Sequence, residues 1–171
     1  MQILCHLGRI LRRSDGTIDA AATNSQRRRA MSEPAADLFA AARAARAHAY
    51  APYSGFAVGA AVRGASGRVY AGCNVENAAY PAGTCAEAGA IAAAVAAGER
   101  RIVEALVTAD SDEPVTPCGA CRQRLREFAS DDSPVHSAGA AGVVATFHLG
   151  DLLPRSFGPQ HLPNAIREID P

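Results

Sequence analysis

The sequence contains no lysine and no tryptophan, and aromatic residues make up only 5% of its 171 positions. The absence of lysine excludes any mechanism that needs a lysine Schiff base or a lysine anchor for phosphate. Seventeen arginines face seventeen acidic residues, so the chain has no net positive field that would gather nucleic acid or an anionic membrane. This charge balance favours small neutral partners.

No run of apolar residues approaches the ~20 that a membrane-spanning helix needs. The five cysteines are an odd number without a convincing secretory signal, so a complete disulfide framework is not expected. Reduced thiols or metal ligands in a cytoplasmic protein are expected instead. A length of 171 residues with 49% apolar residues suits a single domain with a sizeable core.

Residues 1–31 differ in character from the rest of the chain. Six arginines and two aspartates give this segment a charge of about +4, which leaves about −4 for the remainder. We expect a disordered or non-native extension, with Met31 as an alternative start, and one folded domain over residues 32–171. A targeting or nucleic-acid-binding arm is the functional alternative.

The remaining sequence predicts alternating helices and strands. A first helix begins with Ser32 as its N-cap and is stopped by Pro52, and a later helix begins with Thr84 as its N-cap and ends before Gly98. Strands are predicted at residues 56–62, 68–75, 102–108, 135–138 and 143–147, with further helical segments at 118–128 and 149–153. This order indicates an α/β fold with a mixed sheet covered by helices.

Cysteines stand at the start of two of these predicted helices. Cys85 opens one, and Cys118 and Cys121 lie three residues apart at the start of the other. A helix N-terminus offers free backbone N–H groups and the positive end of the dipole, which stabilise the thiolate that zinc binds. The three-residue spacing is typical of zinc sites, so these three cysteines form the candidate ligand set.

Three protein ligands leave the fourth tetrahedral position open, as in a catalytic zinc site. Glu87 follows Cys85 too closely to be an easy second ligand, yet it is near enough to exchange protons with a water at that position. The alternative is a closed structural site with Cys73 as the fourth ligand. Strand alternation instead places Cys73 on the face of Val69 and Ala71, as a small core residue.

Asn74 and Glu76 stand two residues apart at the end of a predicted strand, so their side chains project to the same side. An amide beside a carboxylate suits ribose hydroxyls, although two solvent-facing polar residues are the plain alternative. The loop at residues 50–56 carries three aromatic residues that could supply a stacking face.

Five blocks of residues, in one collinear order between about 36 and 162, resemble the cytidine deaminase family of small enzymes that act on free nucleosides. The blocks are residues 50–61, 72–80, 85–87, 117–123 and 152–157. The resemblance implies a three-layer α/β/α sandwich with a five-stranded mixed sheet, in which residues 32–171 form the catalytic domain. It also implies a homotetramer whose sites are shared between subunits.

The family's activity, carried over by this resemblance, is hydrolytic deamination of cytidine and deoxycytidine to uridine and deoxyuridine, with release of ammonia, in pyrimidine salvage. One Zn²⁺ per subunit would be held by Cys85, Cys118 and Cys121, and Glu87 would shuttle protons. The remaining matched positions would contact the nucleoside: Phe56, Asn74, Glu76, Ala78, Tyr80, the backbone of Ala86 and, from a neighbouring subunit, Phe157.

The chain departs from the family pattern directly after Glu87, where an arginine is usual and Ala88 stands. Three thiolates on Zn²⁺ leave a net negative cluster, which resists the formation of hydroxide. Arg122, beside Cys121, and backbone N–H groups are the candidates for compensation. We therefore predict that Arg122→Ala lowers activity more than zinc occupancy.

Three other functions compete with this interpretation. A related deaminase of a blasticidin-type nucleoside antibiotic would share these motifs. A deaminase that edits nucleic acid would commonly carry His in place of Cys85 and would need a basic channel, whereas residues 32–171 are acidic. A non-enzymatic zinc-binding interaction module would bind zinc and be indifferent to Glu87→Gln.

Overall fold

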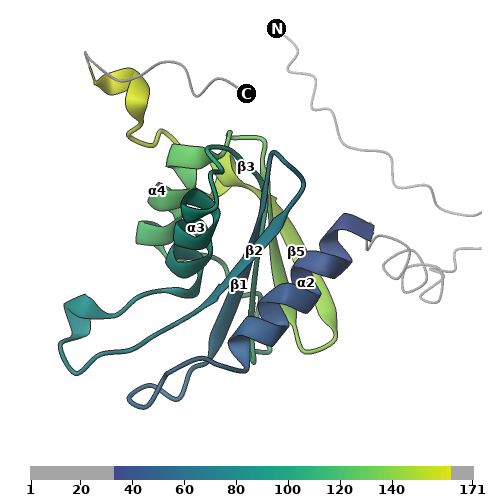
Figure 1. The fold of residues 1–171 in the computed structure, drawn as a ribbon, viewed down its shortest axis with the longest axis vertical. Helices are drawn as coiled ribbons and strands as arrows, with labels where there is room; N and C mark the ends of the chain where they lie inside the picture. Colours follow the sequence, from purple (N-terminus) through teal and green to yellow (C-terminus); the bar gives the residue numbers. More distant parts are fainter. Residues whose placement is uncertain (1–32, 163–171) are drawn as a thin grey trace, which may run out of the picture. The chain divides into compact units, whose positions relative to one another are not determined.

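Five strands form one mixed sheet within residues 33–162, the part of the chain that the computed structural model describes. The strands are ordered β2-β1-β3-β4-β5, with β3 and β4 parallel and the other neighbouring pairs antiparallel (Figure 1). Their bounds are Val58–Gly64 (β1), Val69–Cys73 (β2), Ile102–Ala109 (β3), Pro134–Gly139 (β4) and Gly142–His148 (β5). The predicted five-stranded mixed sheet is therefore confirmed.

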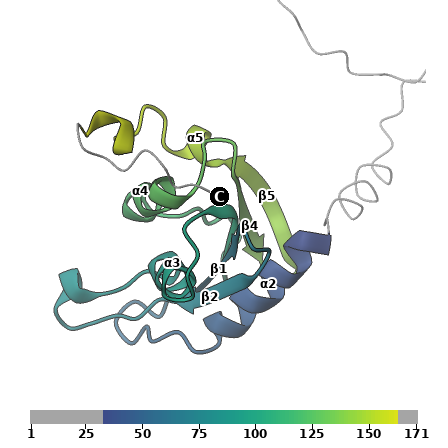
Figure 2. The ribbon, with the colours of Figure 1, turned by 45° about the horizontal axis from the view of Figure 1, so that its top comes forward.

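Helices cover both faces of this sheet. Helix α2 packs against β1, β2 and β3 on one face, whereas α3 packs against β1 and β2 on the other and also contacts α4 (Figure 2). The helical segments are Glu33–Arg46 (α2), Ala86–Ala96 (α3), Gly119–Phe128 (α4) and Leu149–Leu152 (α5), with 3₁₀ turns at Tyr80–Ala82 (η1) and Pro159–His161 (η2). The three layers confirm the predicted α/β/α arrangement. None of these helices is both long and apolar enough to cross a membrane.

Two apolar cores hold the layers together because strand side chains alternate between the faces. Leu38 of α2 packs with Leu106 of β3 on one side, and Leu125 of α4 packs with Ile102 and Val135 on the other. Each of these side chains is 2% exposed or less. Burial of a side chain of this size stabilises the fold by about 1.5–3 kcal/mol.

Helix α2 ends at Arg46, earlier than the stop predicted at Pro52. The backbone N–H of Tyr50 donates to the carbonyl of Asn74, and the N–H of Glu76 donates to the carbonyl of Tyr50. This pairing with the chain beyond β2 needs an extended backbone, so it ends the helix before the proline. The predicted N-cap Ser32 and residues 1–31 lie outside the described part of the chain.

The start of α3 also differs from the prediction, because its N-cap is Cys85 and not Thr84. Thr84 instead forms an isolated antiparallel bridge with Val75, with backbone hydrogen bonds of 2.8 and 2.9 Å. The bridge connects the segment after β2 to the residue before Cys85. Gly98, predicted to end this helix, follows it with a φ of +95°.

Gly72 of β2 brings α3 directly onto the sheet. A Cβ atom at this position would lie 2.5 Å from the nitrogen of Ala90 and 2.6 Å from the carbonyl oxygen of Ala86, both in the α3 backbone. Only a residue without a side chain allows this approach. The first turn of α3, which carries Glu87, is therefore held against β2.

Candidate metal centre and adjoining pocket

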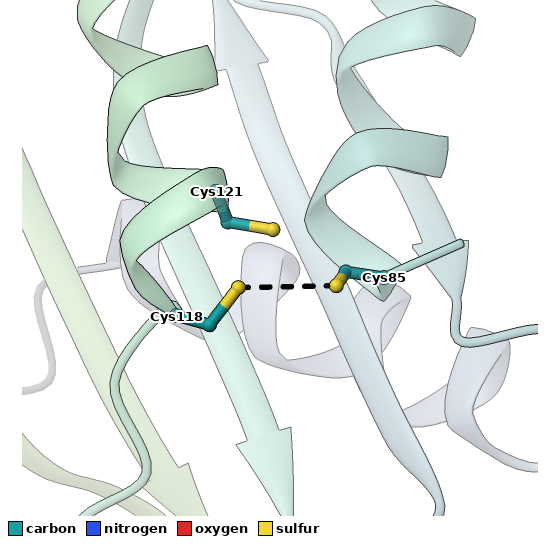
Figure 3. Close-up of side chains that lie close together, drawn as sticks. All are labelled: Cys85, Cys118 and Cys121. Atoms are coloured by element: carbon teal, nitrogen blue, oxygen red, sulfur yellow. Dashed lines mark hydrogen bonds between the residues drawn. The ribbon is translucent and has the colours of Figure 1, made fainter. Parts of the chain in front are cut away.

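Three cysteine thiols converge at the N-termini of α3 and α4. Cys85 is the N-cap of α3, Cys118 is the N-cap of α4, and Cys121 lies in the first turn of α4. Their sulfur atoms all lie within 4.8 Å of one another, and the Sγ atoms of Cys85 and Cys118 are 3.9 Å apart (Figure 3). The structure therefore brings together the three residues that the sequence selected as metal ligands.

The local backbone explains why these thiols meet. Both N-cap cysteines have extended backbone angles, so their side chains lie outside the helical turns and turn toward each other. The three-residue spacing then places Cys121 one turn beyond Cys118 on the same side of α4. Cys121 is fully buried, whereas Cys118 is exposed.

Burial and neighbouring charge act differently on the three thiols. Burial raises the pKa of Cys121, and the Glu87 carboxylate raises it further. Burial also raises the pKa of Cys85. Burial opposes ionisation of Cys118 too, but hydrogen bonds from the backbone and thiol of Cys121 and from the thiol of Cys85 outweigh it and lower the pKa of Cys118. A metal that binds here displaces protons from the cluster.

The sulfur geometry fits zinc. Two sulfurs at about 2.3 Å from one tetrahedral Zn²⁺ lie about 3.8 Å apart, close to the 3.9 Å between Cys85 and Cys118. Within residues 33–162, the group of close ligand atoms consists of these three thiols alone. Cys73 is half-buried on β2 and does not belong to the group, so the alternative of a fourth thiolate from this strand is not supported.

Glu87 lies in the first turn of α3 and is only 6% exposed. It stands outside the ligand group, yet it is close enough for its charge to act on all three thiols. A buried carboxylate beside a metal site, but not bound to it, is placed to exchange protons with a reactant at the open position.

A pocket of about 460 Å³ opens beside Cys85, within the range of small-molecule sites. Three of the predicted substrate contacts line it, namely Asn74, Glu76 and Tyr80. Tyr80 is 78% exposed and meets Tyr53 edge to face, with ring centroids 6.2 Å apart. These two tyrosines leave much of their ring surface at the mouth of the pocket uncovered.

Asn74 and Glu76 also hold the aromatic loop at residues 50–56. Asn74 Oδ1 accepts a hydrogen bond from the Val58 N–H at 2.8 Å, and its Nδ2 donates to the Phe56 carbonyl at 2.9 Å. Glu76 Oε2 accepts from the Tyr53 N–H at 2.8 Å. Both residues line the pocket, while part of their hydrogen-bonding capacity shapes its wall.

The other predicted substrate contacts do not line this pocket. Phe56 and Ala78 are exposed on the loops around it, and Ala86 is buried in the first turn of α3. Phe157 is 58% exposed and stacks on His161, with ring centroids 5.1 Å apart. None of these four residues contributes to the lining of this pocket.

Arg122 donates to three neutral acceptors. Its Nε bonds the Pro117 carbonyl at 2.7 Å, its Nη1 bonds the Leu152 carbonyl at 2.8 Å, and its Nη2 bonds the Thr116 hydroxyl at 2.9 Å. It therefore ties the loop before Cys118 to the end of α5. Arg124 was not predicted from the sequence, yet its Nη1 lies 3.9 Å from Cys121 Sγ. The three-residue spacing from Cys121 was the available signal.

Three thiol ligands, a buried carboxylate outside the ligand set and an open pocket together define a catalytic type of zinc centre on an α/β sandwich. Comparison with known proteins gives the family. The model of the cytidine and deoxycytidylate deaminase zinc-binding region matches residues 32–137. The chain belongs to this family, which binds zinc, and Cys85, Cys118 and Cys121 form a cluster that can hold a metal ion.

Relatives and solved structures agree with this membership. A cytidine deaminase from Sporosarcina psychrophila is 41% identical over 131 residues, which cover 77% of this chain and 96% of the relative. The crystal structure of a cytidine deaminase from Burkholderia pseudomallei matches with a TM-score of 0.69 and 43% identity, covering 74% of this chain and 100% of that one. The enzyme from Mycobacterium tuberculosis matches with a TM-score of 0.63 and 38% identity, over 72% and 96% of the two chains.

Proposed function

We propose that this protein hydrolyses cytidine and deoxycytidine to uridine and deoxyuridine and releases ammonia. The observation that carries this proposal is the burial of Glu87 beside three convergent thiols, next to a pocket of about 460 Å³. Membership of the cytidine and deoxycytidylate deaminase family supports the same reaction. The balanced charge of the chain suits an uncharged nucleoside.

Glu87 is the proposed catalytic acid and base. Cys85, Cys118 and Cys121 would hold the zinc ion, which would supply a Lewis acid for the attacking water. Glu87 moves the two protons of the attacking water in turn: it takes the first as the oxygen attacks C4 of cytosine and delivers it to N3, and it then takes the second from the C4 hydroxyl and delivers it to the departing amino group. The C4–N4 bond breaks, and the amino group leaves as ammonia.

The pocket residues are proposed to orient the nucleoside. Asn74 and Glu76 contact the ribose with the hydrogen-bonding capacity that the loop leaves open, and Tyr80 forms part of the wall. The remaining proposed contacts with the nucleoside are Phe56, Ala78 and the backbone of Ala86. This arrangement leaves the mouth of the pocket to be completed by another surface.

A homotetramer with shared sites and one Zn²⁺ per subunit is proposed to supply that surface. Tyr80 and Phe157 are 78% and 58% exposed in the single chain, and burial against a neighbour removes apolar area from water. Phe157 is proposed to reach the site of the neighbouring subunit. Residues 32–171 form the proposed catalytic domain, and residues 1–31 lie outside it.

In the cell, we propose a cytoplasmic role in pyrimidine salvage, with no nucleic-acid or membrane partner. Equal numbers of acidic and basic residues support this proposal, because a protein that binds a nucleic-acid strand or an anionic lipid surface needs a basic patch. Ammonia and a uracil nucleoside are the expected products.

The first test follows the ultraviolet absorbance of cytidine after addition of the zinc-loaded protein, with Glu87→Gln as the control. We expect the cytidine spectrum to change with the unaltered protein, whereas Glu87→Gln retains zinc and leaves the spectrum unchanged. Zinc content is measured in both proteins. Full zinc occupancy without any change in cytidine or deoxycytidine would overturn the proposal, and a blasticidin-type nucleoside would then be assayed.

A further inference from the structure

The zinc centre of this chain carries a surplus of negative charge. Three thiolates outweigh one Zn²⁺ by one negative charge, and the buried carboxylate of Glu87 adds another when it is ionised. Burial of unpaired charge is costly. Ala88, directly after Glu87, offers no cation to the cluster.

Cys121 is the thiol whose negative charge is least stabilised by solvent. It is 0% exposed, so water does not solvate its sulfur, whereas Cys118 is exposed and Cys85 is half-buried. A cation that reaches this sulfur stabilises the cluster where solvent cannot.

Arg124 makes this contact. Its Nη1 donates to Cys121 Sγ at 3.9 Å, within hydrogen-bonding reach of a sulfur acceptor. The two residues lie three positions apart on α4, so the helix places the guanidinium on the same side as the thiol. An arginine keeps its charge at any pH at which the protein is folded.

We propose that Arg124 is a positioning residue that offsets the negative charge of the zinc thiolate cluster through Cys121. The sequence pointed to Arg122 as the cation that compensates the thiolates. The Arg122 guanidinium instead donates to three neutral acceptors around the loop before Cys118, so Arg124 is the residue assigned to this role. The proposal concerns metal binding and not the substrate, so it holds or fails independently of which nucleoside the protein deaminates.

The test measures the Kd of zinc by competition with a chromogenic chelator, using the full-length protein. Arg124→Gln removes the charge, and Arg124→Lys keeps it. Arg43→Gln is the matched control, because Arg43 is an exposed arginine of α2, on the opposite face of the sheet. We expect Arg124→Gln to weaken zinc binding by about 10-fold, because the loss of a residue that hydrogen-bonds to a metal ligand lowers the metal affinity by about this factor. Arg124→Lys should recover most of the affinity, and Arg43→Gln should leave it unchanged.

The spectrum of the Co²⁺-substituted protein gives a second readout that a merely structural role would not move. Loss of a positive charge from Cys121 raises the energy of its sulfur electrons, so the sulfur-to-cobalt charge-transfer band of Arg124→Gln should shift to lower energy. An unshifted band together with an unchanged Kd would overturn the proposal. Equal losses of affinity in Arg124→Gln and Arg124→Lys, or in Arg124→Gln and Arg43→Gln, would overturn it as well. Circular dichroism verifies folding, and Arg124→Met replaces Arg124→Gln if the latter does not fold.

Discussion

The hydroxyl of Ser54 donates to Oε1 of Glu76, while the backbone N–H groups of Tyr53 and Ser54 donate to the other oxygen at 2.8 and 3.2 Å. One carboxylate thus collects three donors from the tip of the aromatic loop. Ser54 and Glu76 both line the pocket. The orientation of the carboxylate in the pocket therefore depends on Ser54.

Ser54→Ala should weaken substrate binding more than turnover. Loss of the hydroxyl removes one of the three donors that orient Glu76, but leaves Glu87 and the thiols untouched. We expect the KM for cytidine to rise by about threefold, with kcat nearly unchanged, because the loss of one exposed hydrogen bond weakens binding by little more than this factor. Ser111→Ala, in an exposed loop outside the pocket, is the control. A selective loss of kcat would contradict this role of Ser54.

The same contacts predict a pH dependence of the aromatic loop. The Ser54 hydroxyl and the Tyr53 N–H lower the pKa of Glu76 below its ordinary value of 4.5. A carboxylate with a lowered pKa stabilises the folded loop fully above the ordinary pKa, and this contribution is lost as the pH falls through the lowered value. The Tyr53 and Ser54 amide resonances should therefore stay constant down to about pH 4.5 and shift below it. In Glu76→Gln, this acid transition should be absent.

Arg122→Ala should lower activity more than zinc occupancy. The guanidinium ties the Pro117 and Leu152 carbonyls together, so its loss loosens the loop that leads into Cys118 without removing a ligand. Turnover and bound zinc, measured on the same preparations, separate the two effects. Arg100→Ala is the matched control, because Arg100 also donates to backbone carbonyls, those of Val95 and Glu99. Unchanged turnover in Arg122→Ala would remove this residue from any positioning role.

The metal site was predictable from sequence because it depends on local rules. Helix starts and a three-residue spacing bring Cys118 and Cys121 to one side of α4, and a second helix start places Cys85 nearby. The positions of the strands along the chain also follow from local patterns. The convergence of the α3 and α4 N-termini on one point, in contrast, depends on how the layers of the sandwich pack.

Contacts between distant segments were not predictable in this way. Helix α2 ends at Arg46 because Tyr50 pairs with the chain beyond β2, which overrides the helical spacing of the alanines. The direction of Arg122 depends on the Leu152 carbonyl, 30 residues away. The three-residue spacing from Cys121 favours Arg124, whereas the contacts that hold the Arg122 guanidinium away from the thiol come from the packing around α4.

Gly72→Ala should destabilise both the fold and the metal site. The added Cβ would lie 2.5 Å from the backbone nitrogen of Ala90 and 2.6 Å from the Ala86 carbonyl oxygen, and backbone atoms cannot move aside as a flexible side chain does. Helix α3 must therefore shift away from β2, which costs about 1–3 kcal/mol as other forms of overpacking do. Because Cys85 begins α3, the same shift spreads the three thiols and weakens zinc binding.

Gly119→Ala is the matched control for this substitution. A Cβ at Gly119 meets nothing within 4 Å, although the residue directly follows Cys118. Alanine favours the helix over glycine by about 0.5–1 kcal/mol, so Gly119→Ala should unfold at an equal or slightly higher temperature and keep its zinc. Thermal unfolding with and without a chelator measures both properties. A Gly72→Ala protein with the Tm and zinc Kd of the unaltered chain would show that α3 does not depend on close contact with β2 to place Cys85.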